Sequence, residues 1–128
     1  MNNSAGLYIH IPFCKSKCPY CDFYSMRYEE SAARDYADRL KKEFEKYRGA
    51  EFDTVYFGGG TPSILPPEMI ADILDSADKN FKISADSEIT IECNPSKDLE
   101  NDFRIYKSIG INRVSIGMQS AVKEERLA

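Results

Sequence analysis

Residues 54–74 read TVYFGGGTPSILPPEMIADIL. The first four residues, Thr54 to Phe57, are β-branched or aromatic and predict a short strand. Three glycines end this strand, and Pro66-Pro67 opens a helix whose apolar residues recur at spacings of three and four. This apolar stripe consists of Ile70, Ile73, Leu74, Ala77 and Phe81. The stretch therefore predicts a strand, a glycine loop and a helix in succession.

The same alternation continues on both sides of this unit. The further strands predicted by short apolar runs are Leu7–Ile11, Glu88–Cys93 and Val114–Ile116. Helical periodicity predicts helices over about 31–48 and 98–109, closed by Gly49 and Gly110. The resulting order, β-α-β-α-β-α-β, predicts one α/β domain over residues 1–128 with a parallel sheet and right-handed crossovers.

Composition excludes several classes of protein. The 128 residues include 42% hydrophobic and 30% charged residues, as in ordinary globular domains. The formal net charge of −4 argues against non-specific nucleic-acid binding, which needs clustered Lys and Arg. No apolar run approaches the roughly 20 residues of a membrane span, and the N-terminus shows no signal peptide. We therefore expect a cytoplasmic protein.

Three cysteines lie within eight residues. Cys14, Cys18 and Cys21 have the spacing C-x3-C-x2-C. Thiolates are soft ligands that select Zn, Cu(I) or iron–sulfur clusters. Full protein ligation of a [4Fe–4S] cluster takes four cysteines, so three cysteines leave one iron open to another ligand. This pattern favours a cluster with an open iron.

Two alternatives remain for this loop. His10, the single histidine, lies four residues before Cys14, so a structural Cys3His zinc site is conceivable. The three residues could also be ordinary thiols. Cys93 lies far from the loop in a predicted strand, where we expect a small buried side chain and not a fourth ligand.

Every distinctive segment follows a predicted strand. The cysteine loop, GGGTPS (58–63), ECNP (92–95) and GMQS (117–120) each come at or just after a strand end. Because parallel strands end at one edge of a sheet, and chemistry in α/β folds gathers at that edge, the four segments are predicted to converge there.

These segments resemble a known family. The cysteine spacing, with Tyr20 before the last ligand, is similar to the signature of the radical S-adenosylmethionine (SAM) superfamily. GLYIHIPFCKSKCPYCDFYS, FGGGTPS, ECNP and NRVSIGMQS resemble its oxygen-independent coproporphyrinogen III oxidase-like branch, from Gly6 to Ser120. The resemblance implies the N-terminal portion of a partial (β/α)6 TIM-like barrel.

The resemblance also implies cofactors and their ligands. It assigns the [4Fe–4S] cluster to Cys14, Cys18 and Cys21, with SAM at the open iron and reductive cleavage to a 5′-deoxyadenosyl radical. The SAM contacts it implies are Tyr8, Tyr20, Gly58, Gly59, Gly60, Thr61, Glu92 and Gln119. For these residues the alternatives are a plain turn, local packing, or a polar residue on a sheet face or loop. The implied partners are a tetrapyrrole or heme and an electron donor such as flavodoxin or ferredoxin. His10, the single histidine, is the one imidazole in this sequence that could bind heme.

Three departures from the family pattern stand out, and two of them bear on the branch. Decarboxylating members carry a further cysteine two positions after the third ligand, where this chain has Phe23, and a longer segment before the cluster than the 13 residues that precede Cys14. Both favour the HemW-like heme-chaperone branch over an oxygen-independent coproporphyrinogen III dehydrogenase. A radical SAM core has six βα units and this family adds a C-terminal domain, so we expect residues 1–128 to be an incomplete N-terminal part.

Overall fold

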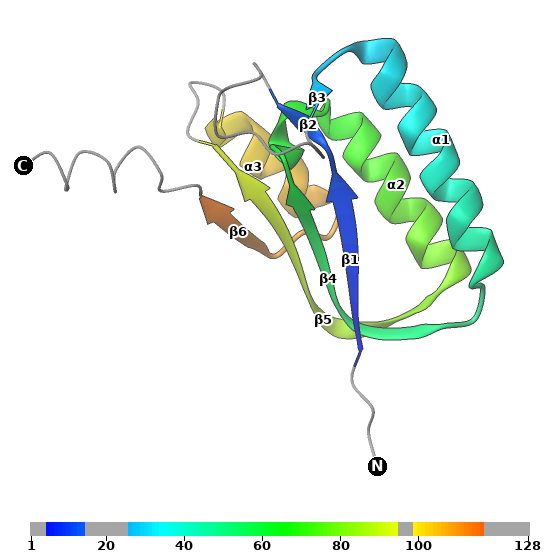
Figure 1. Ribbon diagram of the computed structural model, residues 1–128. Coiled ribbons are helices and arrows are strands. Elements are labelled where there is room, and N and C mark those ends of the chain that lie inside the picture. The colour runs from blue at the N-terminus through cyan, green and yellow to red at the C-terminus, as the bar shows by residue number, and fades with distance from the viewer. Residues whose placement is uncertain (1–4, 15–25, 95–98, 117–128) are drawn as a thin grey trace, which may run out of the picture.

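A parallel four-stranded sheet lies at the centre of the computed structural model (Figure 1), which describes residues 5–14, 26–94 and 99–116. In spatial order its strands are β1 (Gly6–Ile11), β4 (Glu51–Gly59), β5 (Lys82–Cys93) and β6 (Arg113–Ile116), all parallel. The connecting helices are α1 (Glu30–Lys46), α2 (Pro67–Asn80) and α3 (Leu99–Ser108). This order confirms the predicted β-α-β-α-β-α-β alternation.

The core lies between the sheet and the helices. Alternate strand residues are fully or almost fully buried on one side of the sheet, which follows from the period of two in a strand; they are Ile9, Ile11, Val55, Phe57, Ile91 and Cys93. Helix α2 packs against both α1 and α3, and Figure 1 shows the helices gathered on this side. The predicted apolar stripe of α2 is buried from Ile70 to Ala77.

Phe81 differs from the prediction in one respect. It lies just after α2 with an extended backbone (φ −119°, ψ 159°), not within the helix. Its ring is buried and packs edge-on against Phe44 of α1 at 5.2 Å and Phe52 of β4 at 5.0 Å between ring centroids. The residue therefore belongs to the core as expected, but it joins α1 to the sheet.

Two strands are longer than periodicity indicated. β4 begins at Glu51 and β5 at Lys82, where the pairs Glu51↔Lys82 and Phe52↔Ile83 extend the ladder before a register shift. The mostly polar stretch 82–87 carries no strand period, and within it Lys82 and Ile83 pair with β4. Also unpredicted are η1 (Pro62–Ile64) and the two-residue strands β2 (Phe13–Cys14) and β3 (Met26–Arg27), which pair with each other.

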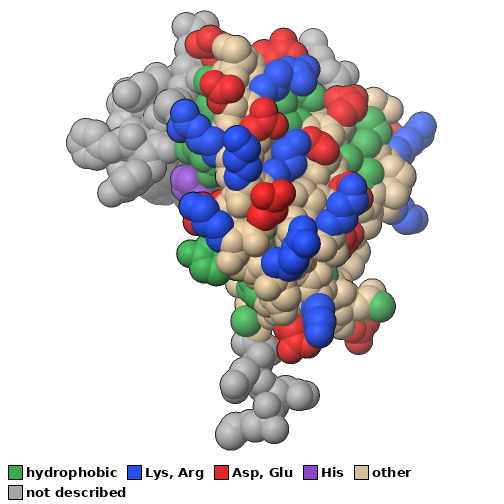
Figure 2. Space-filling model, turned by 90° about the vertical axis from the view of Figure 1, so that its right-hand side faces the viewer, with side chains coloured by type: hydrophobic (Ala, Val, Ile, Leu, Met, Phe, Trp, Pro, Cys, Tyr) green, Lys and Arg blue, Asp and Glu red, His purple; other side chains and the backbone are tan. Residues whose placement is uncertain are grey.

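The outer surface over the helices carries interspersed charges of both signs (Figure 2). Several belong to ion pairs within one helix, such as Arg34 with Glu30 and Lys79 with Asp75. These exposed pairs contribute little to stability. No helix in the described part of the chain is long and apolar enough to cross a membrane.

Candidate functional site

Polar and aromatic side chains occupy the side of the sheet opposite the core. Parallel strands in register present paired residues on the same face, and successive residues on alternate faces. The pairs Tyr8↔Tyr56, Tyr56↔Thr90 and Thr90↔Arg113 form one row, and His10↔Gly58 and Glu92↔Ser115 lie one step nearer the C-terminal edge. We call these residues together the polar face.

Tyr56 is in contact with two residues of the polar face for which SAM contacts are predicted. Its ring stacks on Tyr8, with 5.9 Å between centroids and 13° between planes. Its hydroxyl donates a hydrogen bond of 2.7 Å to Oε2 of Glu92. The Glu92 carboxylate, near the end of β5, therefore has Tyr56 as a hydrogen-bond partner. Sequence reasoning did not single out Tyr56, although its position two residues before Gly58 placed it on the same face.

The Glu92 carboxylate influences both tyrosines. The pKa of Tyr56 is raised above its ordinary value, first by the hydrogen bond to Glu92 and then by burial, while a hydrogen bond from Ser115 acts in the opposite direction. Burial raises the pKa of Tyr8, and the negative charge of Glu92 adds to that effect. Both phenols are therefore held protonated, as hydrogen-bond donors.

The three predicted glycines lie against three different partners. A Cβ on Gly58 would lie 2.6 Å from the Tyr8 hydroxyl oxygen, so Tyr8 bends over this residue. Gly59 has φ +111°, and a Cβ there would lie 2.8 Å from two atoms of the His10 ring. A Cβ on Gly60 would lie 2.5 Å from the Phe13 carbonyl oxygen. Each glycine is thus required for close packing against β1 or β2.

Backbone hydrogen bonds join the glycine loop to the segment that leads into Cys14. The Gly60 N–H donates to the Ile11 carbonyl at 2.8 Å, and the Thr61 N–H donates to the Phe13 carbonyl at 2.7 Å. On the other side, β2 pairs in parallel with β3, so Cys14 lies opposite Arg27. The short strands on either side of residues 15–25 therefore lie beside each other at the C-terminal edge of the sheet.

A second contact links the glycine loop to the end of β5. The side-chain amide of Asn94 donates to the Thr61 hydroxyl at 3.2 Å, and the Asn94 N–H donates to the Ser63 hydroxyl at 3.4 Å. Thr61 thus contacts both the segment before Cys14 and the residue after Cys93. The glycine loop, the residues that lead into Cys14 and the end of β5 therefore lie together at one edge of the sheet.

Several predicted site residues lie outside the described part. Cys18, Cys21, Tyr20 and Gln119 are among them, and the structure describes only the backbone of Cys14. Their assignment stays a prediction. Among the described residues, no group of three His, Cys, Asp or Glu side chains could hold a metal ion.

Cys93 is a buried thiol, as predicted. It is 2% exposed and lies on the core side of β5, opposite to the polar face. Burial raises the pKa of this thiol to about 11, and a hydrogen bond with Ser63 acts in the opposite direction. The side chain therefore behaves as a small apolar residue.

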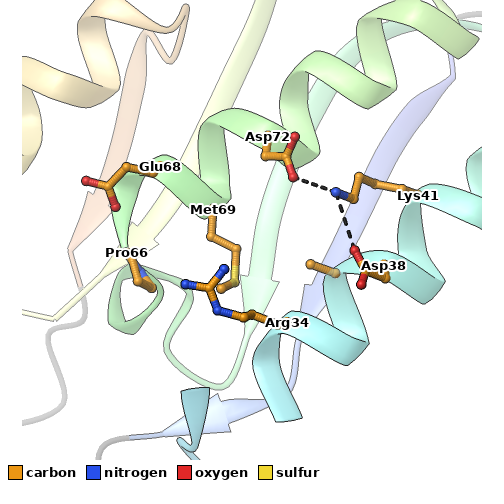
Figure 3. A pocket seen from close by; sticks show the side chains of 8 residues that line it. Arg34, Asp38, Lys41, Pro66, Glu68, Met69 and Asp72 are labelled. Carbon is orange, nitrogen blue, oxygen red and sulfur yellow. Dashed lines mark hydrogen bonds and ion pairs between the residues drawn. The ribbon is translucent and has the colours of Figure 1, made fainter. Parts of the chain in front are cut away.

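A groove of about 430 Å³ lies between α1 and α2 (Figure 3), on the helical side of the sheet. Lys41 reaches across it and contacts Asp38 at 3.5 Å and Asp72 at 2.5 Å. Arg34 and Glu68 lie at the other end. None of these residues belongs to the polar face, so the groove is separate from the convergence of predicted ligands.

Comparison with known families decides the class of the chain. The sequence model described as the Radical SAM superfamily matches residues 8–127. The chain belongs to the radical SAM superfamily. The solved structure of coproporphyrinogen III oxidase (HemN) from Escherichia coli, described as a radical SAM enzyme, matches this radical SAM chain with a TM-score of 0.75 and 32% identity. The match covers 88% of this chain and 27% of that one, and it confirms the predicted fold.

Relatives of this radical SAM chain include heme chaperones. Heme chaperone HemW of Escherichia coli (strain K12) is 40% identical over 125 residues, which are 94% of this chain and 33% of the relative. Radical S-adenosyl methionine domain-containing protein 1, mitochondrial, of Mus musculus is 36% identical over 120 residues, 91% of this chain and 27% of the relative. The radical SAM chain thus spans about a third of the length of the curated relatives it matches.

Proposed function

We propose that this chain binds a [4Fe–4S] cluster through Cys14, Cys18 and Cys21, and SAM at the open iron, as the N-terminal part of a radical SAM core. The observation that carries the proposal is the hydrogen bonding of the Gly60 and Thr61 amides to the Ile11 and Phe13 carbonyls. These bonds hold the glycine loop directly beside the segment that enters the cysteine motif.

The residues present fit this pair of cofactors. Three closely spaced thiolates suit an iron–sulfur cluster with one open iron. The polar face offers the Glu92 carboxylate as an acceptor for ribose hydroxyls and the ring of Tyr8, which stacks on Tyr56, as a flat surface. A bound reduced cluster would supply the electron for reductive cleavage of SAM to methionine and a 5′-deoxyadenosyl radical.

In this proposal the chain's own residues bind and orient SAM. In the proposal, Tyr8, the three glycines, Thr61 and Glu92 contact SAM, together with Tyr20 and Gln119. The close packing of Gly58 and Gly59 under Tyr8 and His10 keeps the two rings low on the sheet.

For the whole protein we propose heme binding and transfer, with flavodoxin or ferredoxin as electron donor. The support is the identity with proteins named heme chaperone HemW and the presence of Phe23 where decarboxylating members carry a cysteine. The alternative is oxidative decarboxylation of coproporphyrinogen III, which is favoured by the structural match to a protein named coproporphyrinogen III oxidase.

Anaerobic reconstitution with iron and sulfide tests the cofactor proposal. After reduction, a [4Fe–4S]+ EPR signal that changes when SAM is added is the expected result. Cys14→Ala is expected to abolish the signal, whereas the matched control Cys93→Ala keeps it, because Cys93 lies on the core side of the sheet. Retention of zinc without a cluster would contradict the proposal and support the Cys3His alternative.

A second experiment separates the two whole-protein functions. The reconstituted protein is mixed with heme and, separately, with coproporphyrinogen III under reducing conditions with SAM. The chaperone proposal expects stoichiometric heme binding seen in the Soret absorbance and no decarboxylated product. Formation of protoporphyrinogen would instead establish the dehydrogenase.

A further inference from the structure

The Tyr56 hydroxyl donates a hydrogen bond to the Glu92 carboxylate, and the orientation of this carboxylate decides which further donors it can accept. Oε2 of Glu92 receives the Tyr56 hydrogen at 2.7 Å, and both side chains are partly buried. An ionised carboxylate has about four lone-pair sites, so one bond to Tyr56 leaves capacity for further donors. That bond also fixes the direction in which the remaining sites point.

The Tyr56 ring is itself held in place from two sides. Tyr8 stacks on it with 5.9 Å between ring centroids, and the ring lies so close to Gly58 that a Cβ there would be 3.0 Å from Tyr56 Cε1. A phenol constrained in this way presents its hydroxyl at one place. The flexible Glu92 side chain is therefore oriented by a rigid neighbour, which reduces the conformational freedom that binding would have to remove.

We propose that Tyr56 is a positioning residue, whose hydroxyl orients the Glu92 carboxylate to accept hydrogen bonds from the ribose of SAM. The inference rests on the proposed function, because it takes Glu92 as the ribose ligand. Tyr56 acts through Glu92 and does not itself contact the cofactor.

The first test asks whether the bond exists in solution and needs no cofactor. The tyrosinate absorbance of the chain is titrated with and without Tyr56→Phe, and the difference gives the pKa of Tyr56. The carboxylate holds this pKa above its ordinary value, so Glu92→Gln is expected to lower it. An unchanged Tyr56 pKa in Glu92→Gln would overturn the inference.

The second test measures SAM affinity on the cluster-loaded chain. Tyr56→Phe keeps the ring stack and removes only the hydroxyl, and we expect the dissociation constant for SAM to rise about tenfold. Glu92→Ala is expected to weaken binding at least as much. The double variant should then bind no more weakly than Glu92→Ala alone, because Tyr56 has lost the group through which it acts.

A modified ligand distinguishes the positioning role of Tyr56 from a purely structural one. With a SAM analogue lacking both ribose hydroxyls, Tyr56→Phe should carry no penalty, since the oriented carboxylate then has no donor to receive. The matched control is Tyr47→Phe, the same substitution at an exposed tyrosine just after α1, which should leave both affinities unchanged.

The outcomes separate this inference from the proposed function. If Glu92→Ala weakens SAM binding while Tyr56→Phe matches Tyr47→Phe, the positioning role is wrong and the proposed function stands. Additive losses in the double variant also refute action through Glu92. If the unaltered chain binds no SAM, the proposed function fails and the positioning role with it, while the tyrosine titration still reports the bond itself.

Discussion

The amide of Gly60 donates a 2.8 Å hydrogen bond to the carbonyl of Ile11, across the gap between two parallel strands. Gly60 follows β4, and Ile11 ends β1. Through this bond, the loop after one strand and the segment that enters the cysteine motif form a single structural unit. The position of Cys14 therefore depends on residues almost fifty positions further along the chain.

Gly60→Ala adds only one methyl group, but it should disrupt the contact between the glycine loop and the segment that enters the cysteine motif. The new Cβ would lie 2.5 Å from the Phe13 carbonyl oxygen and 3.0 Å from its carbon, and backbone atoms cannot turn away. We expect less iron bound per chain after anaerobic reconstitution, together with a lower free energy of unfolding. Iron and protein assays on the purified variant measure the first effect.

The control for that substitution is Gly49→Ala. Gly49 has φ +94°, with nothing within 4 Å of an added Cβ. Alanine there costs about 1–2 kcal/mol through backbone conformation alone, with iron binding unchanged. Equal iron content in Gly60→Ala and Gly49→Ala would show that the glycine loop does not fix the position of the segment that enters the cysteine motif.

The Cys93 thiol is expected to resist alkylation at neutral and mildly alkaline pH. Its pKa of about 11 lies two units above the ordinary value of 9.0, so its thiolate fraction at pH 8 falls about 100-fold. Mass spectrometry of the Cys93 peptide after iodoacetamide treatment measures this. The same peptide should react readily in denaturant, and equal rates in both states would contradict the burial.

The same pKa shift predicts a loss of stability at high pH. The folded state favours the protonated thiol, so its contribution is fully present below pH 9, the unfolded value, and is lost as pH rises through about 11. The tyrosines whose pKa values are raised act in the same direction. Urea denaturation at stepped pH should show stability falling above pH 9, and less steeply in Cys93→Ala.

Two tyrosines give opposite expectations for one substitution. The Tyr36 hydroxyl donates to the His10 carbonyl, whereas the buried Tyr106 hydroxyl has no hydrogen-bond partner among the described residues. Tyr36→Phe should lower the free energy of unfolding by about 0.5–1.5 kcal/mol. Tyr106→Phe should leave it unchanged or raise it by up to about 1 kcal/mol, because it removes an unpaired buried hydroxyl. Urea denaturation of both variants compares them, and a larger loss in Tyr106→Phe would be inconsistent with this assignment.

Phe81→Ala should be strongly destabilising. The ring packs edge-on between Phe44 and Phe52, and its removal leaves a cavity between α1 and the sheet. The expected cost is about 3–5 kcal/mol. Thermal or urea denaturation measures it beside Tyr47→Ala, an exposed aromatic whose loss should stay within about 0.5 kcal/mol. Similar values for the two variants would mean that the aromatic cluster carries no special share of stability.

Local sequence patterns predicted the fold because the three helices and most of the central sheet carry their own apolar residues at regular spacing. The stripe of α2 and the run Leu7–Ile11 were identifiable without knowledge of their neighbours. Lys82–Ser87 was not, because this stretch has no apolar period, and its pairing with β4 begins with Glu51↔Lys82 and Phe52↔Ile83 before a register shift. The two-residue strands β2 and β3 are likewise too short to carry a period.

The candidate site was predicted unevenly for a related reason. Motif resemblance pointed to Glu92, Tyr8 and the glycines, because they lie at or near strand ends in recognisable segments. Tyr56 appeared as an ordinary strand aromatic, and its role depends on a hydroxyl that reaches diagonally to the neighbouring strand. Contacts of that kind arise from register, which a single strand's sequence does not contain.

The strand order β1-β4-β5-β6 has a consequence for how the chain folds during synthesis. Each strand of this sheet pairs with the sheet strand that is synthesised next, so none has to wait for a strand beyond its immediate successor. Tyr8 and Tyr56 can stack as soon as the first βαβ unit closes. Glu92 then arrives with β5 and meets a tyrosine pair that is already in place.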